Sequence, residues 1–211
     1  MDHRYAILID GAFFVRKLRS KLNRHPEVDD VMKAIDEITQ SQLFQGYDLL
    51  RIYYYDARPA TNRLTNPISR EEINLAETEV YRRNISFLDK LELKQNIALR
   101  LGELSANGWK LKRSTLDDPV IQTRALVSDD LTMDIEQKGV DLRIGLDIAR
   151  LSMARLVQTI VVVTGDSDLV PAFKFARREG VRVVLSHMGH GVMRNLKAHA
   201  DLVLEDAVAK K

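Results

Sequence analysis

The sequence predicts an α/β fold in which a parallel sheet lies between two layers of helices and carries an added β-hairpin. Short apolar runs alternate with segments of helical spacing along the 211 residues. Most of these runs are apolar throughout, which is typical of parallel strands buried on both faces. Asn107-Gly108, between two alternating segments, supplies the hairpin signal.

The first part of the chain contains two predicted strands and two predicted helices. Tyr5–Ile9 is an apolar run that enters a turn at Asp10-Gly11, and Leu49–Tyr55 is β-branched and aromatic. Between them, Phe13–Leu22 and Val28–Leu43 have helical spacing, interrupted at Arg24-His25-Pro26.

The middle of the chain is predicted as an insertion around residues 98–134 in a single domain that spans 1–211. We expect a loop over Arg58–Pro67 and helical structure over Arg70–Gln95. The predicted hairpin pairs Leu99–Leu104 with Trp109–Arg113. Beyond it, Val120–Val127 has strand character, and Ser128-Asp129-Asp130 is suited to opening a short helix.

From Gly139 the pattern returns to regular alternation. It predicts, in order, helix Asp141–Leu156, strand Thr159–Val163, helix Leu169–Glu179, strand Val181–Leu185, helix Val192–Ala200 and strand Leu202–Leu204.

The composition narrows the chemistry. The chain has no cysteine, which excludes disulfides, thiolate metal sites and thiol nucleophiles. A metal site would therefore use oxygen or imidazole ligands, which favours hard ions such as Mg²⁺ or Mn²⁺. No apolar run approaches the roughly 18 residues that a membrane span needs, and Met1-Asp2-His3-Arg4 does not resemble a signal peptide. We expect a cytoplasmic location.

Four aspartates stand at positions that the predicted fold should bring to one edge. Asp10 follows the first strand, Asp166 and Asp168 follow Thr159–Val163, and Asp141 begins the helix before that strand. Each taken singly could be a helix cap or a first-turn acid. Caps do not explain why four acids converge, and clustered carboxylates repel unless a divalent cation neutralises them. The pattern predicts a Mg²⁺ or Mn²⁺ site.

Two other patterns are less suited to that site. Asp147 lies six residues after Asp141, about 240° round a helix, and should point elsewhere. His187 and His190, with His199 beyond them, could suggest a zinc site, but no third ligand stands at a convincing spacing. The glycine-containing loop around His187 and His190 is therefore predicted as the turn into the last helix.

Three blocks of sequence, taken together, carry a resemblance. They are ILIDGAFF at 7–14, KGVD at 138–141 with Asp147 beyond, and VTGDSDLVP at 163–171, with Gly180–Val183 and Ala200-Asp201 in addition. The set resembles the NYN domain family, in its LabA-like branch of the PIN-like nuclease superfamily. The resemblance implies a Rossmann-like (PIN-like) parallel sheet and a hydrolase that cleaves RNA phosphodiesters with Mg²⁺ or Mn²⁺.

On that resemblance, Asp10, Asp141, Asp166 and Asp168 correspond to the family's acidic, metal-binding and catalytic positions. One departure stands out. Many relatives carry asparagine three residues after the first aspartate, and Phe13 stands there in this chain, as in some LabA-like members. The alternative function is therefore a catalytically weak, PIN-like RNA-binding or regulatory protein.

Single-stranded RNA is the expected partner, and two groups of residues are candidates to contact it. Thr164 and Ser167 could orient the carboxylates, while cations near the acidic motifs could bind phosphate: Lys138, Lys174 and Arg177. The second group surrounds Trp109 and consists of Lys110, Lys112 and Arg113. The alternative is that Trp109 packs on the core and the cations form a solvated face. Homo-oligomer formation through the hairpin stays open.

Overall fold

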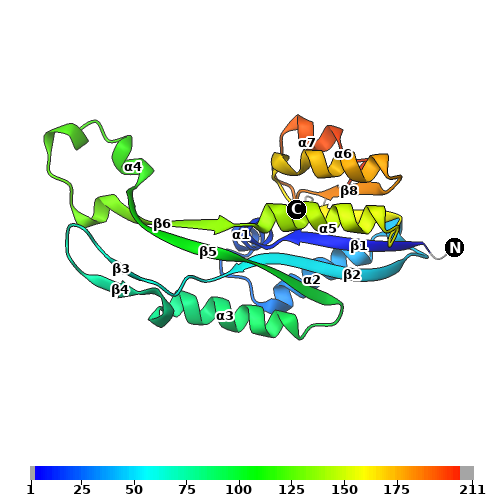
Figure 1. Cartoon of the computed structure of the whole chain (residues 1–211), viewed down its shortest axis with the longest axis horizontal. Helices are drawn as coiled ribbons and strands as arrows, with labels where there is room; N and C mark the ends of the chain where they lie inside the picture. The colour runs from blue at the N-terminus through cyan, green and yellow to red at the C-terminus, as the bar shows by residue number, and fades with distance from the viewer. Residues whose placement is uncertain (1–2, 205–211) are drawn as a thin grey trace. The chain divides into compact units, whose positions relative to one another are not determined.

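The fold is that of a computed structural model, which describes residues 3–204 (Figure 1). A seven-stranded sheet has the order β6-β5-β2-β1-β7-β8-β9, and a separate two-stranded sheet joins β3 to β4. The strands are β1 (Arg4–Asp10), β2 (Asp48–Arg58), β3 (Arg63–Thr65), β4 (Glu72–Asn74), β5 (Ile97–Leu111), β6 (Leu131–Lys138), β7 (Thr159–Val163), β8 (Arg182–Ser186) and β9 (Leu202–Leu204).

Helices connect the strands of the large sheet. They are α1 (Gly11–Leu22), α2 (Val28–Thr39), α3 (Glu79–Glu92), α4 (Arg113–Leu116), α5 (Val140–Met153), α6 (Val170–Arg178) and α7 (Arg194–Ala198). Short 3₁₀ turns occur at Gln42–Phe44, Leu75–Glu77, Ile121–Thr123, Ser128–Asp130 and Ser167–Leu169. No helix among residues 3–204 is long and apolar enough to cross a membrane.

The chain forms two compact units. In its described part, the first comprises residues 3–56, 87–101 and 139–204. Its centre is the parallel pairing of β1 with β7, in which Tyr5 faces Thr159 and Ile9 faces Val163. β1 also pairs in parallel with β2, β7 with β8, and β8 with β9. Because β7 is buried at every position, an uninterrupted apolar sequence is what this environment requires.

The sheet of the first unit is covered on both faces. Alternate residues of β1 point to opposite sides, so Leu8 packs with α5 and α6 whereas Ile7 packs with α1 and α2. The first face includes Ile144 and Phe173, each with no exposed surface. The three-layer α/β class predicted from the sequence is confirmed.

The second unit comprises residues 57–86 and 102–138. In it, β5 pairs antiparallel with β6, and β3 pairs antiparallel with β4. A small apolar cluster forms around Leu64, Leu75 and Ala106, with Trp109 partly buried against it. This unit includes residues 57–86, which precede the predicted insertion around residues 98–134.

The predicted turn at Asn107-Gly108 is wrong. Residues 97–111 form one continuous strand, and its antiparallel partner is β6. Ala106 pairs with Ile135 and Trp109 pairs with Met133. Two residues on β5 therefore lie opposite one residue on β6 between these pairs, and the register shifts. Gly108 has a φ angle of +112°, which glycine adopts readily. Asn107-Gly108 therefore forms a β-bulge and not a hairpin turn.

Three neighbouring predictions also need correction. The expected loop over 58–67 contains β3, and the start of the expected helix over 70–95 contains β4. Val120–Val127 is not a strand, since it contains a 3₁₀ turn at 121–123 and irregular chain after it. The predicted short helix at Ser128–Asp130 is confirmed as a 3₁₀ turn.

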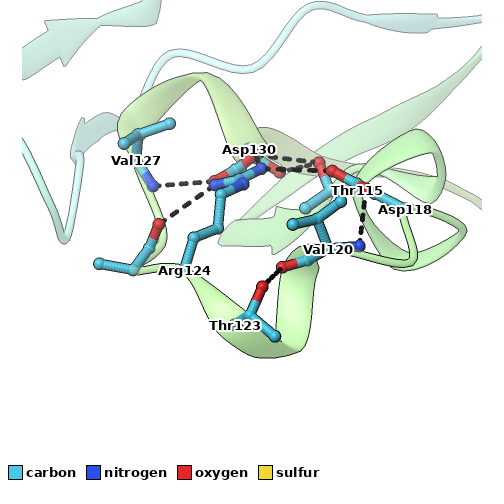
Figure 2. Close-up of polar contacts among 8 residues, drawn as sticks. Thr115, Asp118, Val120, Thr123, Arg124, Val127 and Asp130 are labelled. Atoms are coloured by element: carbon cyan, nitrogen blue, oxygen red, sulfur yellow. Dashed lines mark hydrogen bonds and ion pairs between the residues drawn. The ribbon is translucent and has the colours of Figure 1, made fainter.

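An ion pair organises the connection between β5 and β6, residues 112–130 (Figure 2). Arg124 donates two hydrogen bonds to the carboxylate of Asp130, at 2.6 and 2.7 Å. The same carboxylate accepts the backbone N–H of Val127 at 2.8 Å, and the Thr115 hydroxyl lies 3.4 Å from it. Arg124 therefore holds the pKa of Asp130 well below its usual range.

We predict that Asp130→Asn loosens this connection without unfolding the first unit. The neutral amide cannot reproduce two charge-assisted bonds to Arg124. Trypsin should then cut at Lys112, Arg113 or Arg124 at least several-fold faster than in the wild type. Asp129→Asn, at an exposed neighbouring position, is the matched control. Equal cleavage rates in both variants would contradict the assignment.

Candidate active site

The first carboxylate of the site is placed by the end of β1. Because Ile9 pairs with Val163, Asp10 and Thr164 leave neighbouring strands at the same edge of the sheet. Asp10 caps α1, and its Oδ1 accepts the backbone N–H of Phe13 at 3.0 Å. The Thr164 hydroxyl lies 3.5 Å from Oδ2 of Asp10.

The turn after β7 places the next two carboxylates. The buried Thr164 hydroxyl accepts the backbone N–H of Asp166 at 3.0 Å. Asp166 Oδ1 in turn accepts the backbone N–H of Asp168 at 2.9 Å. Thr164 thus contacts both Asp10 and the Asp166 turn.

Asp141 brings the fourth carboxylate to the same region from the first turn of α5. Burial raises the pKa of Asp10 above its usual value, and the charges of Asp141 and Asp166 raise it further, against the lowering effect of the Phe13 N–H. Burial also raises the pKa of Asp141, and Asp166 and Asp168 add to the rise. The four aspartates therefore repel one another electrostatically.

The chemistry of these donors fits a hard divalent cation, since all four are carboxylates and their repulsion is relieved by positive charge. Within residues 3–204, however, no three potential ligands are already gathered around one point. Asp10 and Asp166 are half-buried and held by backbone N–H groups, whereas Asp141 and Asp168 are exposed. Binding an ion through three or more of these carboxylates would require their side chains to move closer together.

Asp147 has a different role, as its helical position predicts. Its Oδ2 accepts the Tyr55 hydroxyl at 2.9 Å and Arg100 Nε at 3.1 Å. Burial, together with the charge of Asp147, raises the pKa of Tyr55 well above its usual value. Asp147 thus joins α5 to β2 and β5 within the first unit.

The Phe13 side chain is part of the core beside the site. It is 2% exposed, and a Cβ atom added at Gly165 would lie 2.6 Å from its Cε2. The ring also lies 6.0 Å from the His190 ring, centroid to centroid. Only the backbone N–H of Phe13 contacts Asp10, so the residue brings no polar side chain to the acids.

Positive groups beside the acids were missed by the sequence analysis. Arg16, one turn into α1, lowers the pKa of Asp10. Lys17 Nζ lies 2.7 Å from Nδ1 of His190, in the loop after β8. Burial and the charges of Lys17, Arg16 and His187 lower the pKa of His190. The available signal was spacing, because residues three to four after Phe13 share its face of a helix.

A buried hydroxyl was also missed. Tyr54 has no exposed surface, and its hydroxyl has no hydrogen-bond partner among the described residues. Its ring packs so close to Gly11 that a Cβ there would lie 2.7 Å from Cε1. Burial raises the pKa of Tyr54 far above its usual value, and the charges of Asp56 and Asp10 raise it further. Asp56 follows Tyr55, the register partner of Asp10.

Four of the other predicted substrate contacts are in the second unit. Lys110, Lys112, Arg113 and Lys138 are exposed and belong to the second unit. Ion pairs join Lys110 to Asp134 (2.6 Å), Lys138 to Glu136 (3.6 Å) and Arg113 to Asp117 (3.8 Å). The Trp109 indole packs against the small cluster of that unit, and its Nε1 is buried without a hydrogen-bond partner among residues 3–204.

Ser167 is half-buried in the acidic turn, whereas Lys174 and Arg177 are exposed on α6. Arg177, near the end of that helix, donates from Nε to Asp201 at 2.8 Å. α6 begins beside the acidic turn and runs back to the start of β8. Arg177 therefore lies toward the edge of the sheet opposite the carboxylates.

This fold and site define an α/β protein with carboxylates at the carboxyl edge of a mostly parallel sheet. The chain belongs to the NYN domain family, which matches residues 4–205. The fold is therefore PIN-like, and NYN domains are generally nucleases.

Two further comparisons concern curated sequences and solved structures. No curated protein sequence matches the chain. A crystal structure of a protein of unknown function from Vibrio parahaemolyticus has a similar fold, with TM-score 0.51 and 14% identity over 97% of this chain and 94% of that one. A nicotinamidase from Staphylococcus aureus aligns with TM-score 0.34 and 11% identity, over 94% of this chain and 90% of that one.

We predict that Gly165→Ala destabilises the protein by about 1–3 kcal/mol, because its new methyl group would overlap the buried Phe13 ring. Urea unfolding measures the change. Gly145→Ala is the matched control, since its Cβ would meet only Ala172 Cβ at 4.0 Å. In the interior of α5 that change should stabilise by roughly 0.5–1 kcal/mol. Equal effects at the two glycines would contradict the close packing at Gly165.

We predict that Asp10→Asn raises the free energy of unfolding at neutral pH when divalent ions are absent. Asparagine caps a helix as well as aspartate does. The raised pKa of Asp10 means that its ionised form is less favourable in the folded than in the unfolded chain. This cost is complete above the raised pKa and disappears as the pH falls through it toward 3.8.

The advantage of Asp10→Asn over the wild type should therefore shrink between neutral pH and about pH 4. Urea unfolding at several pH values measures it. Asp36→Asn, on the exposed face of α2, should show no such trend. An advantage that stays constant across this range would mean that the Asp10 pKa is not raised.

Proposed function

We propose that this chain is a Mg²⁺- or Mn²⁺-dependent endoribonuclease of the LabA-like branch, acting on single-stranded RNA. The observation that carries the proposal is the convergence of Asp10, Asp141, Asp166 and Asp168 at one edge of the sheet. Burial raises the pKa of both Asp10 and Asp141; the charges of Asp141 and Asp166 add to the rise at Asp10, and those of Asp166 and Asp168 add to it at Asp141, which supports a shared acidic site. A site of this kind is favourable mainly when a cation or a phosphate–cation pair occupies it.

Backbone hydrogen bonds hold two of the four carboxylates in place. Asp10 and Asp166 are oriented in advance by the N–H groups of Phe13 and Asp168, and Thr164 contacts both sides. Asp141 completes the set from α5. When bound, a divalent ion would supply an activated water and neutralise charge on the phosphate and the leaving oxygen.

The cations beside the acids would position the substrate. Arg16 is close enough to Asp10 to lower its pKa, and Lys17 contacts His190 across from it. A phosphodiester placed over the carboxylates would therefore meet positive charge on the α1 side. Burial and the charges of Lys17 and Arg16 lower the pKa of His190, which favours its neutral form.

The alternative function is RNA binding or regulation with weak catalysis. The observation that favours it is Phe13, whose buried ring supplies no polar group beside Asp10. In this case the acidic edge would still bind a metal ion and RNA, but turnover would be slow. The two functions differ in whether the RNA is cut.

We predict that the wild type cleaves labelled single-stranded RNA with Mn²⁺ and stops when EDTA is added. Asp10→Asn and Asp166→Asn should each lower the cleavage rate by at least about 100-fold, or 2.7 kcal/mol in activation free energy. Asp36→Asn should cleave at the wild-type rate. Gel separation of the products measures all four.

Two outcomes decide between the functions. Equal rates in the wild type and both site variants would refute the proposed mechanism and identify a contaminating nuclease. Retarded mobility of intact RNA, with no cleavage in any divalent ion, would support the binding alternative. The cytoplasmic location and any homo-oligomer stay predictions.

A further inference from the structure

The first unit has a hollow lined by basic residues, away from the acids. A hollow of about 750 Å³ lies where α6 ends and β8 and β9 begin. We call it the basic hollow. Its lining consists of Lys174, Arg177, Arg178, Gly180, Val181, Arg182, His199, Asp201 and Leu202.

The basic hollow lies at the opposite edge of the sheet from the carboxylates. Arg182 and Leu202 are the first residues of β8 and β9, whereas Asp10 is the last residue of β1. β1, β7 and β8 run parallel, so their first and last residues mark opposite edges. A five-residue strand such as β8 spans about 16 Å. One phosphate cannot contact both sites.

Charge in the hollow is strongly unbalanced. Four cationic side chains and one histidine line it, against the single carboxylate of Asp201. Both oxygens of this carboxylate are already bonded: Oδ1 accepts Arg177 Nε, and Oδ2 accepts the Val183 N–H, each at 2.8 Å. Asp201 thereby fixes the direction of the Arg177 guanidinium but does not neutralise the other cations.

The lining favours a particular kind of anion. Guanidinium groups bind phosphate oxygens in a bidentate manner, and three arginines are present. The lining includes no Phe, Tyr or Trp, so it offers no stacking platform for bases. The hollow is also far larger than one phosphate ion. These features suit consecutive phosphates of a nucleic-acid backbone, contacted without regard to base sequence.

We propose that the basic hollow binds the phosphate backbone of single-stranded RNA at nucleotides distant from the bond placed over the carboxylates. This inference rests on the proposed function for the identity of the ligand. In this proposal Arg178, Arg182 and His199 bind RNA. They form one site together with Lys174 and Arg177. A strand held at both edges must be long enough to cross about 16 Å.

The test measures binding alone. A labelled single-stranded RNA of about 20 nucleotides is titrated with protein in EDTA, and fluorescence anisotropy gives Kd at several salt concentrations. Arg178→Glu/Arg182→Glu should raise Kd at least about 10-fold at low salt. The slope of log K against log salt should fall by about 1.4, because two phosphate contacts are lost.

The matched control is Lys33→Glu/Lys90→Glu. It makes the same change in net charge at exposed positions on α2 and α3, outside the basic hollow. Its Kd should rise by no more than about 2-fold through the general electrostatic field. Equal losses in the two double variants would overturn the proposal. Tighter binding of a polyglutamate peptide than of RNA, with the same dependence on Arg178 and Arg182, would overturn RNA as the ligand.

Cleavage with Mn²⁺ gives a second measurement. Because the hollow lies about 16 Å from the acids, Arg178→Glu/Arg182→Glu should raise KM for the long RNA and leave kcat unchanged. A lower kcat at unchanged KM would contradict a remote anchoring role. If the protein cuts no RNA, the proposed nuclease function fails. The difference in Kd between the two double variants still tests whether the basic hollow binds RNA.

Discussion

The parallel pairing of β1 with β7 is the constraint on which the site depends. Both strands are buried in the centre of the sheet, and Ile9 faces Val163 in their register. A shift of this register by one residue would invert every core side chain, so apolar burial holds it in place. The same register brings Asp10 next to Thr164, and through Thr164 to the Asp166 turn. Core packing thereby forces carboxylates together that would otherwise separate.

Close packing around the strand ends resists relief of this repulsion. The Tyr54 ring packs against Gly11, and the Phe13 ring packs against Gly165. Neither position has room for a Cβ atom. Burial and the charges of Asp141 and Asp166 raise the pKa of Asp10, and they outweigh the lowering effect of the Phe13 N–H. Repulsion among clustered carboxylates lowers stability, and a bound cation would relieve it.

Acidic and basic residues are nearly equal in number in the sequence, but in the fold they gather at opposite ends of the strands. The chain carries 32 basic and 30 acidic residues, a net charge of +2. In the first unit, acids gather where β1 and β7 end, while arginines gather where β8 and β9 begin. The strands of a parallel sheet all point the same way, so each edge can carry its own charge. In the two proposals made above, one edge binds a nucleic-acid strand and the other cuts it.

The sequence by itself determined the three-layer class, the strands Tyr5–Ile9 and Thr159–Val163, and the acids that follow them, because buried parallel strands leave a continuous local pattern. Only the tertiary structure decided what depends on pairing between distant segments. Asn107-Gly108 has the local signature of a turn, but β6 pairs along β5 and makes the dipeptide a bulge. The contact of Lys17 with His190 likewise joins residues 173 positions apart, which no local pattern encodes.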